Sequence, residues 1–187
     1  MSLTKLSGTG KFNREDHITM FNSNISSVDE NGIVYNTGDP IWEPFGEDND
    51  EITREMNNEL DAKKNVLGKT NIDHTTGPQT TEIDPIAIRG NDSLSTILYY
   101  MYKYNLTGDK ALLQCMEVTL ADVTETTSGN TTTKNYGAFT EDAIVDLKSW
   151  GGDTSKLNSP ITLNWKNNRV HGTFNPTTNA FTPTVVE

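Results

Sequence analysis

Short runs of apolar residues, several of them alternating with polar ones, predict β-strands along most of the chain. In the first half these runs cover residues 18–21, 33–35 and 41–42. In the second half, residues 112–120 and 143–147 have the apolar, β-branched character of central strands. Residues 161–165 and 170–174 alternate on either side of Asn167 and Asn168, which predicts a hairpin. A last strand is expected over 181–186, where Pro183 indicates a sheet edge.

One segment, residues 94–104, has the spacing of a helix. Asn91 or Asp92 can cap it, and Gly108 lies beyond its end. The apolar side chains that fall at three- and four-residue steps are Leu94, Ile97, Leu98, Met101 and Tyr102. Tyr99, Tyr100 and Tyr104 lie beside this stripe, but a helix packed on a sheet explains it better than a ligand-stacking site. The polar residues 124–134, rich in threonine, are expected to form a solvent-exposed loop.

Residues 51–68 fit two patterns. Ile52, Met56 and Leu60 recur every four residues after a possible cap at Asp50, which favours a helix. A strand would place these three side chains on one face, towards the core, and Glu55, Glu59 and Asp61 on the other. Acidic residues outnumber basic ones most strongly just here, between residues 43 and 61.

Composition narrows the possible functions. The 187 residues are long enough for one domain, but only 33% are hydrophobic, so we expect an assembly interface to add to a lean core. A net charge of −11 argues against binding to the phosphates of a nucleic acid. The N-terminus has no apolar signal-peptide stretch and no run is long enough to span a membrane, so folding in a cytoplasm is expected.

Motifs for catalysis or cofactor binding are not recognisable. The single cysteine, Cys115, has no internal disulfide partner, and the three histidines are not spaced as metal ligands. Residues 47–51 (EDNDE) lack the register of a calcium loop, and the carboxylate pairs Glu141 with Asp142 and Glu82 with Asp84 are expected to be surface charge. We therefore expect no enzyme activity, no cofactor and no metal.

Three stretches resemble the tail tube (major tail) proteins of long-tailed bacteriophages and prophages. The first is residues 50–59 (DEITREMNNE) followed by 63–68 (KKNVLG). The second is residues 150–154 (WGGDT) with 168–178 (NRVHGTFNPTT), and the third is residues 83–85 (IDP) leading into the expected helix. The resemblance covers roughly residues 40–185 and is loose over the first 35.

The resemblance implies a mainly β subunit, a β-sandwich or barrel-like tail tube fold with one flanking helix. The small and polar residues 1–13 predict a flexible N-terminal arm, followed by a single domain over 14–187. Six copies would form a ring, and rings would stack into a hollow conduit for viral DNA in the virion tail. The implied partners are other copies of the chain, tail tip or baseplate and tail terminator proteins, a tape measure protein inside the tube, and double-stranded DNA that passes without specific binding; no membrane is involved.

The resemblance also decides between the two interpretations of residues 51–68. It implies a long hairpin with the segment around 79–84 that contributes to the wall of the lumen, so we adopt the strand. Glu55, Glu59 and Asp61 are then expected to face the lumen. Two alternatives stay open: a tube protein of a bacteriocin or a type VI-like injection apparatus, and a carbohydrate-binding β-sandwich with Trp42, Trp150 and Trp165 as stacking platforms.

Overall fold

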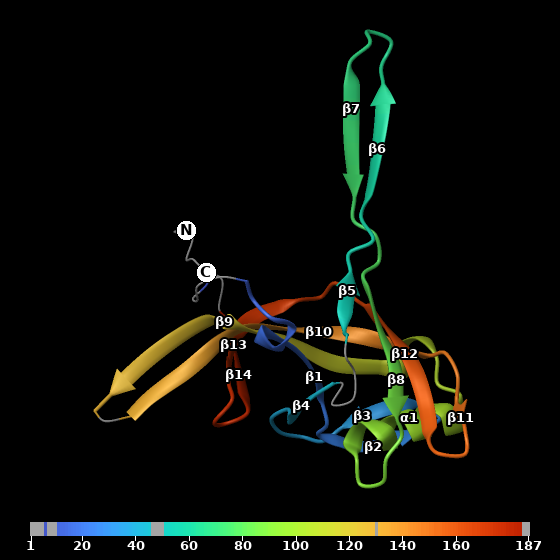
Figure 1. The fold of residues 1–187 in the computed structure, drawn as a ribbon, viewed down its shortest axis with the longest axis vertical. Coiled ribbons are helices and arrows are strands. Elements are labelled where there is room, and N and C mark those ends of the chain that lie inside the picture. The colour runs from blue at the N-terminus through green and yellow to red at the C-terminus, as the bar shows by residue number, and fades with distance from the viewer. Residues whose placement is uncertain (1–5, 7–10, 46–50, 130, 185–187) are drawn as a thin grey trace.

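The protein is mainly β with one α-helix, as the sequence predicts (Figure 1). The computed structural model describes residue 6 and residues 11–45, 51–129 and 131–184. The strands are β1 (His17–Asn22), β2 (Ile25–Asp29), β3 (Gly32–Tyr35), β4 (Trp42–Pro44), β5 (Thr53–Glu55), β6 (Glu59–Lys64), β7 (Thr70–Thr75), β8 (Thr80–Ala87), β9 (Leu112–Ser128), β10 (Thr131–Leu147), β11 (Gly151–Gly152), β12 (Leu157–Trp165), β13 (Val170–Asn175) and β14 (Ala180–Pro183). The helix α1 spans Ser93–Tyr104, and short 3-10 helices cover Arg14–Asp16 and Gly108–Ala111.

A single curled sheet, a half-barrel, forms the body. Its strands run in the order β4-β1-β9-β10-β12-β8-β5, with β11 added on β12, β13 on β10 and β14 on β13. The pairs β2–β3 and β6–β7 form separate two-stranded sheets. Every pairing is antiparallel, so the two faces of each strand can differ sharply in polarity.

The hairpin predicted around Asn167 and Asn168 is wrong, although both of its strands exist. β12 and β13 pair with β10 one after the other along the same edge, at residues 143–147 and 136–140 of β10. The two asparagines bind β10 instead of closing a turn: the Asn167 backbone N–H donates to Glu141 over 2.7 Å, and the Asn168 side chain exchanges hydrogen bonds with Asp142. Asn167 has a φ of 62°, a conformation that asparagine tolerates better than most residues.

The loop expected over residues 124–134 is also wrong. β9 and β10 stay paired up to Ser128 and Thr131 and form a long exposed hairpin that turns at Gly129. Threonine favours strands because its branched side chain suits the pleated surface, and pairing satisfies the backbone polar groups of this segment. The polar composition of this segment therefore indicates exposure to solvent and does not indicate a lack of secondary structure.

The helix begins and ends close to the predicted residues. Asp92 is the N-cap, and its carboxylate accepts a 2.7 Å hydrogen bond from the Ser95 N–H. Asn105 ends the helix in the left-handed conformation. The predicted stripe is confirmed for four residues, Leu94, Ile97, Leu98 and Met101, which are buried. Tyr102 instead is 52% exposed and stacks on Trp150, with ring centroids 4.8 Å apart.

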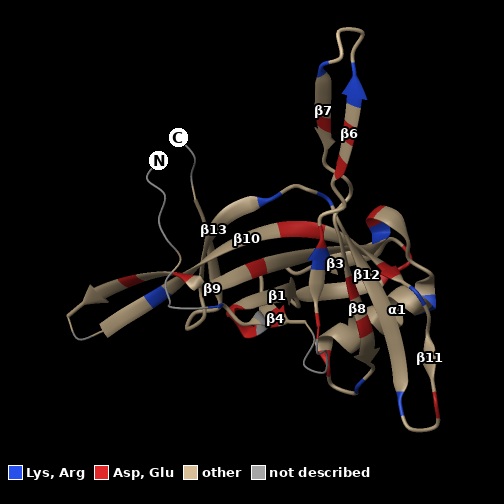
Figure 2. Cartoon of the chain, turned by 45° about the horizontal axis from the view of Figure 1, so that its top comes forward, with Lys and Arg blue, Asp and Glu red and all other residues tan. Residues whose placement is uncertain are grey.

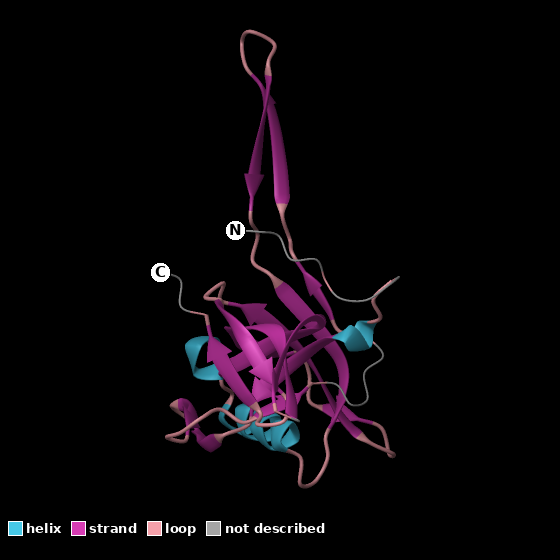
Figure 3. Ribbon diagram, turned by 90° about the vertical axis from the view of Figure 1, so that its left-hand side faces the viewer, coloured by secondary structure: helices cyan, strands magenta, loops and turns pink. Residues whose placement is uncertain are grey.

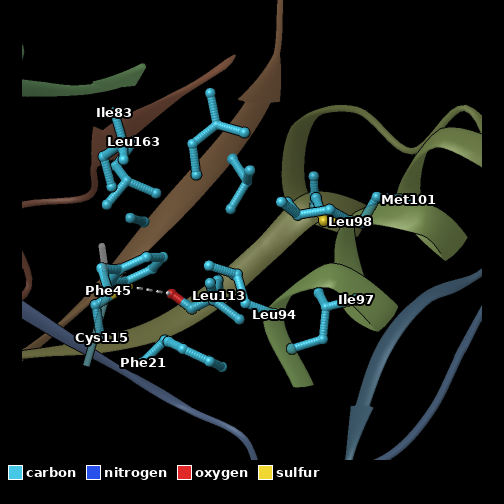
Figure 4. Close-up of a cluster of buried hydrophobic side chains, with 14 of the residues drawn as sticks. Phe21, Phe45, Ile83, Leu94, Ile97, Leu98, Met101, Leu113, Cys115 and Leu163 are labelled. Carbon is cyan, nitrogen blue, oxygen red and sulfur yellow. Dashed lines mark hydrogen bonds between the residues drawn. The ribbon is translucent and has the colours of Figure 1, made fainter. Parts of the chain in front are cut away.

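The main hydrophobic core lies between α1 and one face of the sheet, which we call the helix-side face (Figure 4). Leu98 and Met101 of the helix, Leu113 of β9 and Leu163 of β12 are fully buried in it. Burial of each such side chain contributes about 1.5–3 kcal/mol. The Ala143–Leu113 and Glu141–Cys115 pairings place alternate residues of β9 and β10 on this face.

A second, smaller core covers part of the opposite face of the sheet. It contains Met20, Trp42, Met116, Val118, Ala138 and Phe174. The edge position predicted for Pro183 agrees with β14, which pairs only with β13 among the described strands. Most of the N-terminal arm expected over residues 1–13 lies outside the described residues, as do residues 185–187.

Candidate functional site

A hairpin formed by β6, β7 and their connecting turn, residues 59–75, projects from the body (Figures 1 and 3). We call it the projecting hairpin. Both of its strands are exposed over their whole length. No strand of the described body pairs with it, since β6 and β7 form a sheet of their own.

The projecting hairpin is amphipathic. The pairings Leu60–His74, Ala62–Ile72 and Lys64–Thr70 place these six side chains on one face, and Leu60, Ala62 and Ile72 form its apolar part. The other face carries the alternate, polar residues, among them Glu59, Asp61 and Asp73. Leu60 is 72% exposed and Ile72 67% exposed. An apolar face on a two-stranded ribbon, with nothing in the described chain covering it, is typical of a surface that another molecule covers.

The turn at the end of the projecting hairpin has a defined conformation. The Asn65 side-chain oxygen accepts hydrogen bonds from the N–H groups of Leu67 and Lys69, each at 3.0 Å. Gly68 has a φ of 76°, in the left-handed region that glycine adopts without strain. The turn presents Val66, which is fully exposed, and Leu67, which is 79% exposed. Two large apolar side chains are thus held at the tip.

The base of the projecting hairpin is narrow. Asn57, with a φ of 49°, interrupts the strand between β5 and β6, and its side-chain N–H donates to the carbonyl of Pro78 over 2.8 Å. A Cβ on Gly77 would lie 1.8 Å from the Asn57 carbonyl oxygen, so only glycine fits. The two chain segments cross closely here, and this crossing separates the projecting hairpin from the main sheet.

These observations resolve the two interpretations of residues 51–68. The helix is wrong and the strand is right, but it is broken: β5 pairs with β8, as the predicted hairpin with residues 79–84 requires, whereas β6 pairs with β7. Ile52 packs against the main core. Met56 and Leu60, expected to face the core as well, are 45% and 72% exposed, because the chain leaves the body after β5.

The edge of the main sheet formed by β5 and β8 has an acidic face. Glu55 and Glu82 lie on it, since Thr53 pairs with Glu82 and Glu55 with Thr80. Together with Glu51 and Asp84 they border a hollow of about 310 Å³. All four carboxylates, Glu51, Glu55, Glu82 and Asp84, are exposed, and we call this surface the acidic face. The alternate residues Arg54, Thr81 and Ile83 point to the helix-side face.

The structure therefore separates the three residues predicted to face a lumen. Glu55 belongs to the acidic face, while Glu59 and Asp61 lie on the polar face of the projecting hairpin. Asp61 is opposite Asp73 and forms an ion pair with Lys63. Glu82 and Asp84 also belong to the acidic face, although they were not predicted to do so. The alternation of residues 80–84, with Thr81 and Ile83 buried and Glu82 and Asp84 exposed, carries the signal that would have found them.

A buried cluster of charges joins β5 to the centre of the sheet. The Arg54 guanidinium donates to Glu141 of β10 over 2.6 Å and to Glu117 of β9 over 3.2 Å. Arg169 donates to the same Glu141 oxygen over 2.9 Å. The guanidinium carbon of Arg54 lies 4.0 Å from the centre of the Trp165 ring, in stacking position. Gln79 accepts from both arginines and completes the cluster.

The two carboxylates of this cluster are almost inaccessible to solvent. Glu141 is 3% exposed and Glu117 5% exposed, so the expectation that Glu141 is surface charge is wrong. Burial by itself raises the pKa of Glu117, but the hydrogen bond from His17 and the charge of Arg54 outweigh it and lower the pKa below its ordinary value. Arg54 thereby fixes the position of β5, the strand from which the projecting hairpin continues.

The structure also places other residues that the sequence suggested: two of the tryptophans, the cysteine and possible metal ligands. Trp42 and Trp165 are 4% and 6% exposed, so they do not provide stacking platforms for a sugar. Cys115 is fully buried, and burial raises the pKa of its thiol well above the ordinary value. Within the described ranges no group of three or more His, Cys, Asp or Glu side chains has the arrangement of a metal site, and residues 46–50 of the acidic run lie outside those ranges.

Comparisons of the chain with protein families, with curated proteins and with solved structures give no match. α1, the single α-helix in the described part of the chain, is too short to cross a membrane.

Proposed function

We propose that the protein is the structural subunit of a phage tail tube, in which rings of six copies stack into a hollow conduit for viral DNA. The observation that carries this proposal is the projecting hairpin with its uncovered apolar face. Exposed leucine and isoleucine on a ribbon that packs against nothing in its own body favour a permanent partner. In a protein with a lean core, additional copies of the same chain are the simplest partner.

The charge distribution supports a conduit for DNA. The chain carries a net charge of −11, and the acidic face presents four exposed carboxylates beside two threonines at the edge formed by β5 and β8. Figure 2 shows where acidic residues lie along β8. A surface of this kind repels phosphates, so DNA would slide past it without binding. In this proposal the acidic face lines the lumen, with Glu55 in common with the sequence-based expectation. The resemblance of residues 50–68, 83–85 and 150–178 to tail tube proteins supports the same assembly.

The fold also supports a role in assembly more than in catalysis. The most buried charged groups, Arg54, Glu117 and Glu141, bind one another and leave no carboxylate of the cluster directed at a cleft for acid–base chemistry. Their arrangement stiffens the base of β5. A tube of the same design in a bacteriocin or a type VI-like apparatus would use the same contacts, and a genome-containing particle would distinguish the phage tail from these devices.

Light scattering after size-exclusion chromatography, together with electron microscopy, tests the proposal. The wild-type protein is expected to form rings or tubes with a central hole wide enough for duplex DNA. The double variant Leu60→Ser, Ile72→Ser removes the apolar face and is expected to remain a folded monomer. The matched control Asn71→Ser, Thr75→Ser alters the polar face of the same strands and is expected to assemble like wild type.

Two results would contradict the proposal. The first is a wild-type protein that stays at 20.7 kDa over a wide range of salt and protein concentration. The second is normal tube formation by the Leu60→Ser, Ile72→Ser variant, which would show that the apolar face is not an assembly surface. Circular dichroism of each variant establishes that the body remains folded.

A further inference from the structure

A cavity of about 280 Å³ lies on the face of the sheet opposite the helix. Its apolar wall consists of Pro40, Trp42, Val170 and Phe181. Glu141 and Asp142 of β10 also border it, but only Asp142 belongs to this face of the sheet, since Glu141 alternates to the helix-side face. The Asn179 side chain accepts from the Trp42 N–H over 2.9 Å and donates to the Trp42 carbonyl over 3.0 Å. This pair of bonds joins β4, which carries Trp42, to the turn before β14, which carries Phe181, so two walls of the cavity are tied together.

The electrostatics of the cavity favour a cation. Its lining residues include no lysine or arginine. Glu141 is already paired with Arg54 and Arg169, which neutralise it from the helix side. Asp142 differs, because its carboxylate accepts a 2.8 Å hydrogen bond from the uncharged Asn168 amide. Asp142 is therefore the charge in the cavity that a basic group can still neutralise.

The tip of the projecting hairpin has the complementary chemistry. The exposed apolar pair Val66 and Leu67 is flanked by Lys64 and Lys69, both exposed. Figure 2 shows basic residues at the free end of the projecting hairpin, where β6 ends and β7 begins. A tip that combines apolar side chains with ammonium groups matches a cavity that combines aromatic and aliphatic walls with a carboxylate.

We infer that this cavity is the receptor for the projecting hairpin of a second copy of the chain, an inference that rests on the proposed self-assembly. One of the two apolar tip side chains enters between Trp42, Val170 and Phe181. An ammonium group of Lys64 or Lys69 then pairs with Asp142. The contact covers the exposed apolar tip and neutralises a carboxylate in one step.

The positions of the two surfaces determine what such a contact builds. The tip is at the free end of the projecting hairpin, whereas β4, β13 and β14 belong to the body (Figures 1 and 3). Tip and cavity are different surfaces of one molecule, so the contact is head-to-tail and leaves a free tip and a free cavity at the two ends. Contacts of this type propagate into a ring or an open stack, and not into a closed dimer.

The test uses one variant for each surface. Val170→Trp fills the cavity, and because Val170 is 47% exposed the larger side chain can be accommodated without refolding the sheet. Lys64→Glu, Lys69→Glu reverses the charge of the tip. Lys148→Glu, Lys156→Glu, two exposed lysines on the body, is the matched control for total charge. Each variant alone is expected to stop growth of the assembly, while the control assembles like wild type.

Mixing the cavity variant with the tip variant gives the sharpest result. The mixture retains one intact tip and one intact cavity, so it is expected to form discrete pairs of subunits or of rings that do not grow further. Asp142→Asn, which preserves size, is expected to raise the concentration needed for assembly by about two- to fivefold, and more at low salt.

Normal assembly of Val170→Trp at the wild-type concentration would overturn this inference and leave the proposed tube intact. Unlimited growth of the mixture would overturn it as well, because a head-to-tail contact with one working site cannot propagate. A wild-type protein that never assembles would instead refute the proposed function. Thermal unfolding of each variant shows whether loss of assembly reflects loss of folding.

Discussion

The two ends of the helix-side face of the sheet are built from the same strands but with opposite chemistry. At one end, Leu113 of β9 and Val145 of β10 pack under α1 in an apolar cluster. At the other end, Glu117 of β9 and Glu141 of β10 bind Arg54, also out of reach of solvent. The apolar end holds the helix, which completes the body. The charged end holds β5, from which the projecting hairpin continues.

The two ends thus hold their neighbouring segments by interactions that differ in how strongly they depend on geometry. Apolar contacts contribute stability with little dependence on angle, so the helix can settle wherever packing is best. Hydrogen-bonded ion pairs tolerate only narrow geometries, and Arg54 contacts two carboxylates, one amide and two aromatic rings at once. The segment that must point outward is thus fixed by the more directional type of interaction.

The largest loss of stability is expected when the ion pairs of the charged end are removed. Arg54→Ala should lower the free energy of unfolding by about 3–5 kcal/mol, because it leaves two buried carboxylates without their shared cation. Urea unfolding followed by circular dichroism measures this. Lys148→Ala removes an exposed ion pair with Asp146 and should cost less than about 1 kcal/mol. Equal effects of the two substitutions would show that the buried cluster contributes no more than surface charge.

A substitution in the apolar end should lower the free energy of unfolding by a similar or somewhat smaller amount, through lost packing instead of lost charge pairing. Leu98→Ala removes a fully buried side chain of the helix and should cost about 2–5 kcal/mol through lost burial and the cavity left behind. The loss should be the same from pH 3 to pH 8, because Leu98 packs among apolar side chains in this core. A strongly pH-dependent loss would show that the two ends are coupled.

The smallest expected effect is the pH dependence of the stability that the charged end contributes. The pKa of Glu117 is lower in the folded protein than in the unfolded chain. Its carboxylate therefore stabilises the fold above the unfolded pKa, and this contribution is lost as pH falls through the folded pKa. Glu117→Gln should destabilise at pH 7 and differ progressively less from wild type as pH falls below about 4. A constant difference across this range would contradict the assignment.

The sequence was informative about elements and much less so about their partners. Alternation predicted most strands, and the step of three and four with Asp92 as cap predicted the helix, because both signals are local. Asn167 and Asn168 misled for the same reason: their usual turn conformation is local, but here they bind Asp142 and Glu141, about 26 residues earlier. The burial of Glu117 and Glu141 depends on Arg54 and Arg169, which are distant in sequence and carry no local signal of pairing.

The candidate surface was predicted in part. The alternation of residues 51–61 correctly separated Leu60 from Glu59 and Asp61, but it could not show that the chain leaves the body at Asn57, so an apolar residue assigned to the core is instead exposed. β6 pairs with β7 beyond the close crossing of the chain at Asn57 and Gly77, and hydrophobic periodicity carries no signal for such a crossing.

Because the chain segments cross closely at Asn57 and Gly77, the length of the projecting hairpin is independent of the packing of the body. Since the hairpin's residues do not contribute to either core, evolution or design can lengthen or shorten it without repacking the body. Two residues added to each strand extend it by about 7 Å and preserve which side chains share a face, whereas one residue added to each would exchange the two faces. The same body could thus carry a hairpin of longer or shorter reach, in whole steps of that size.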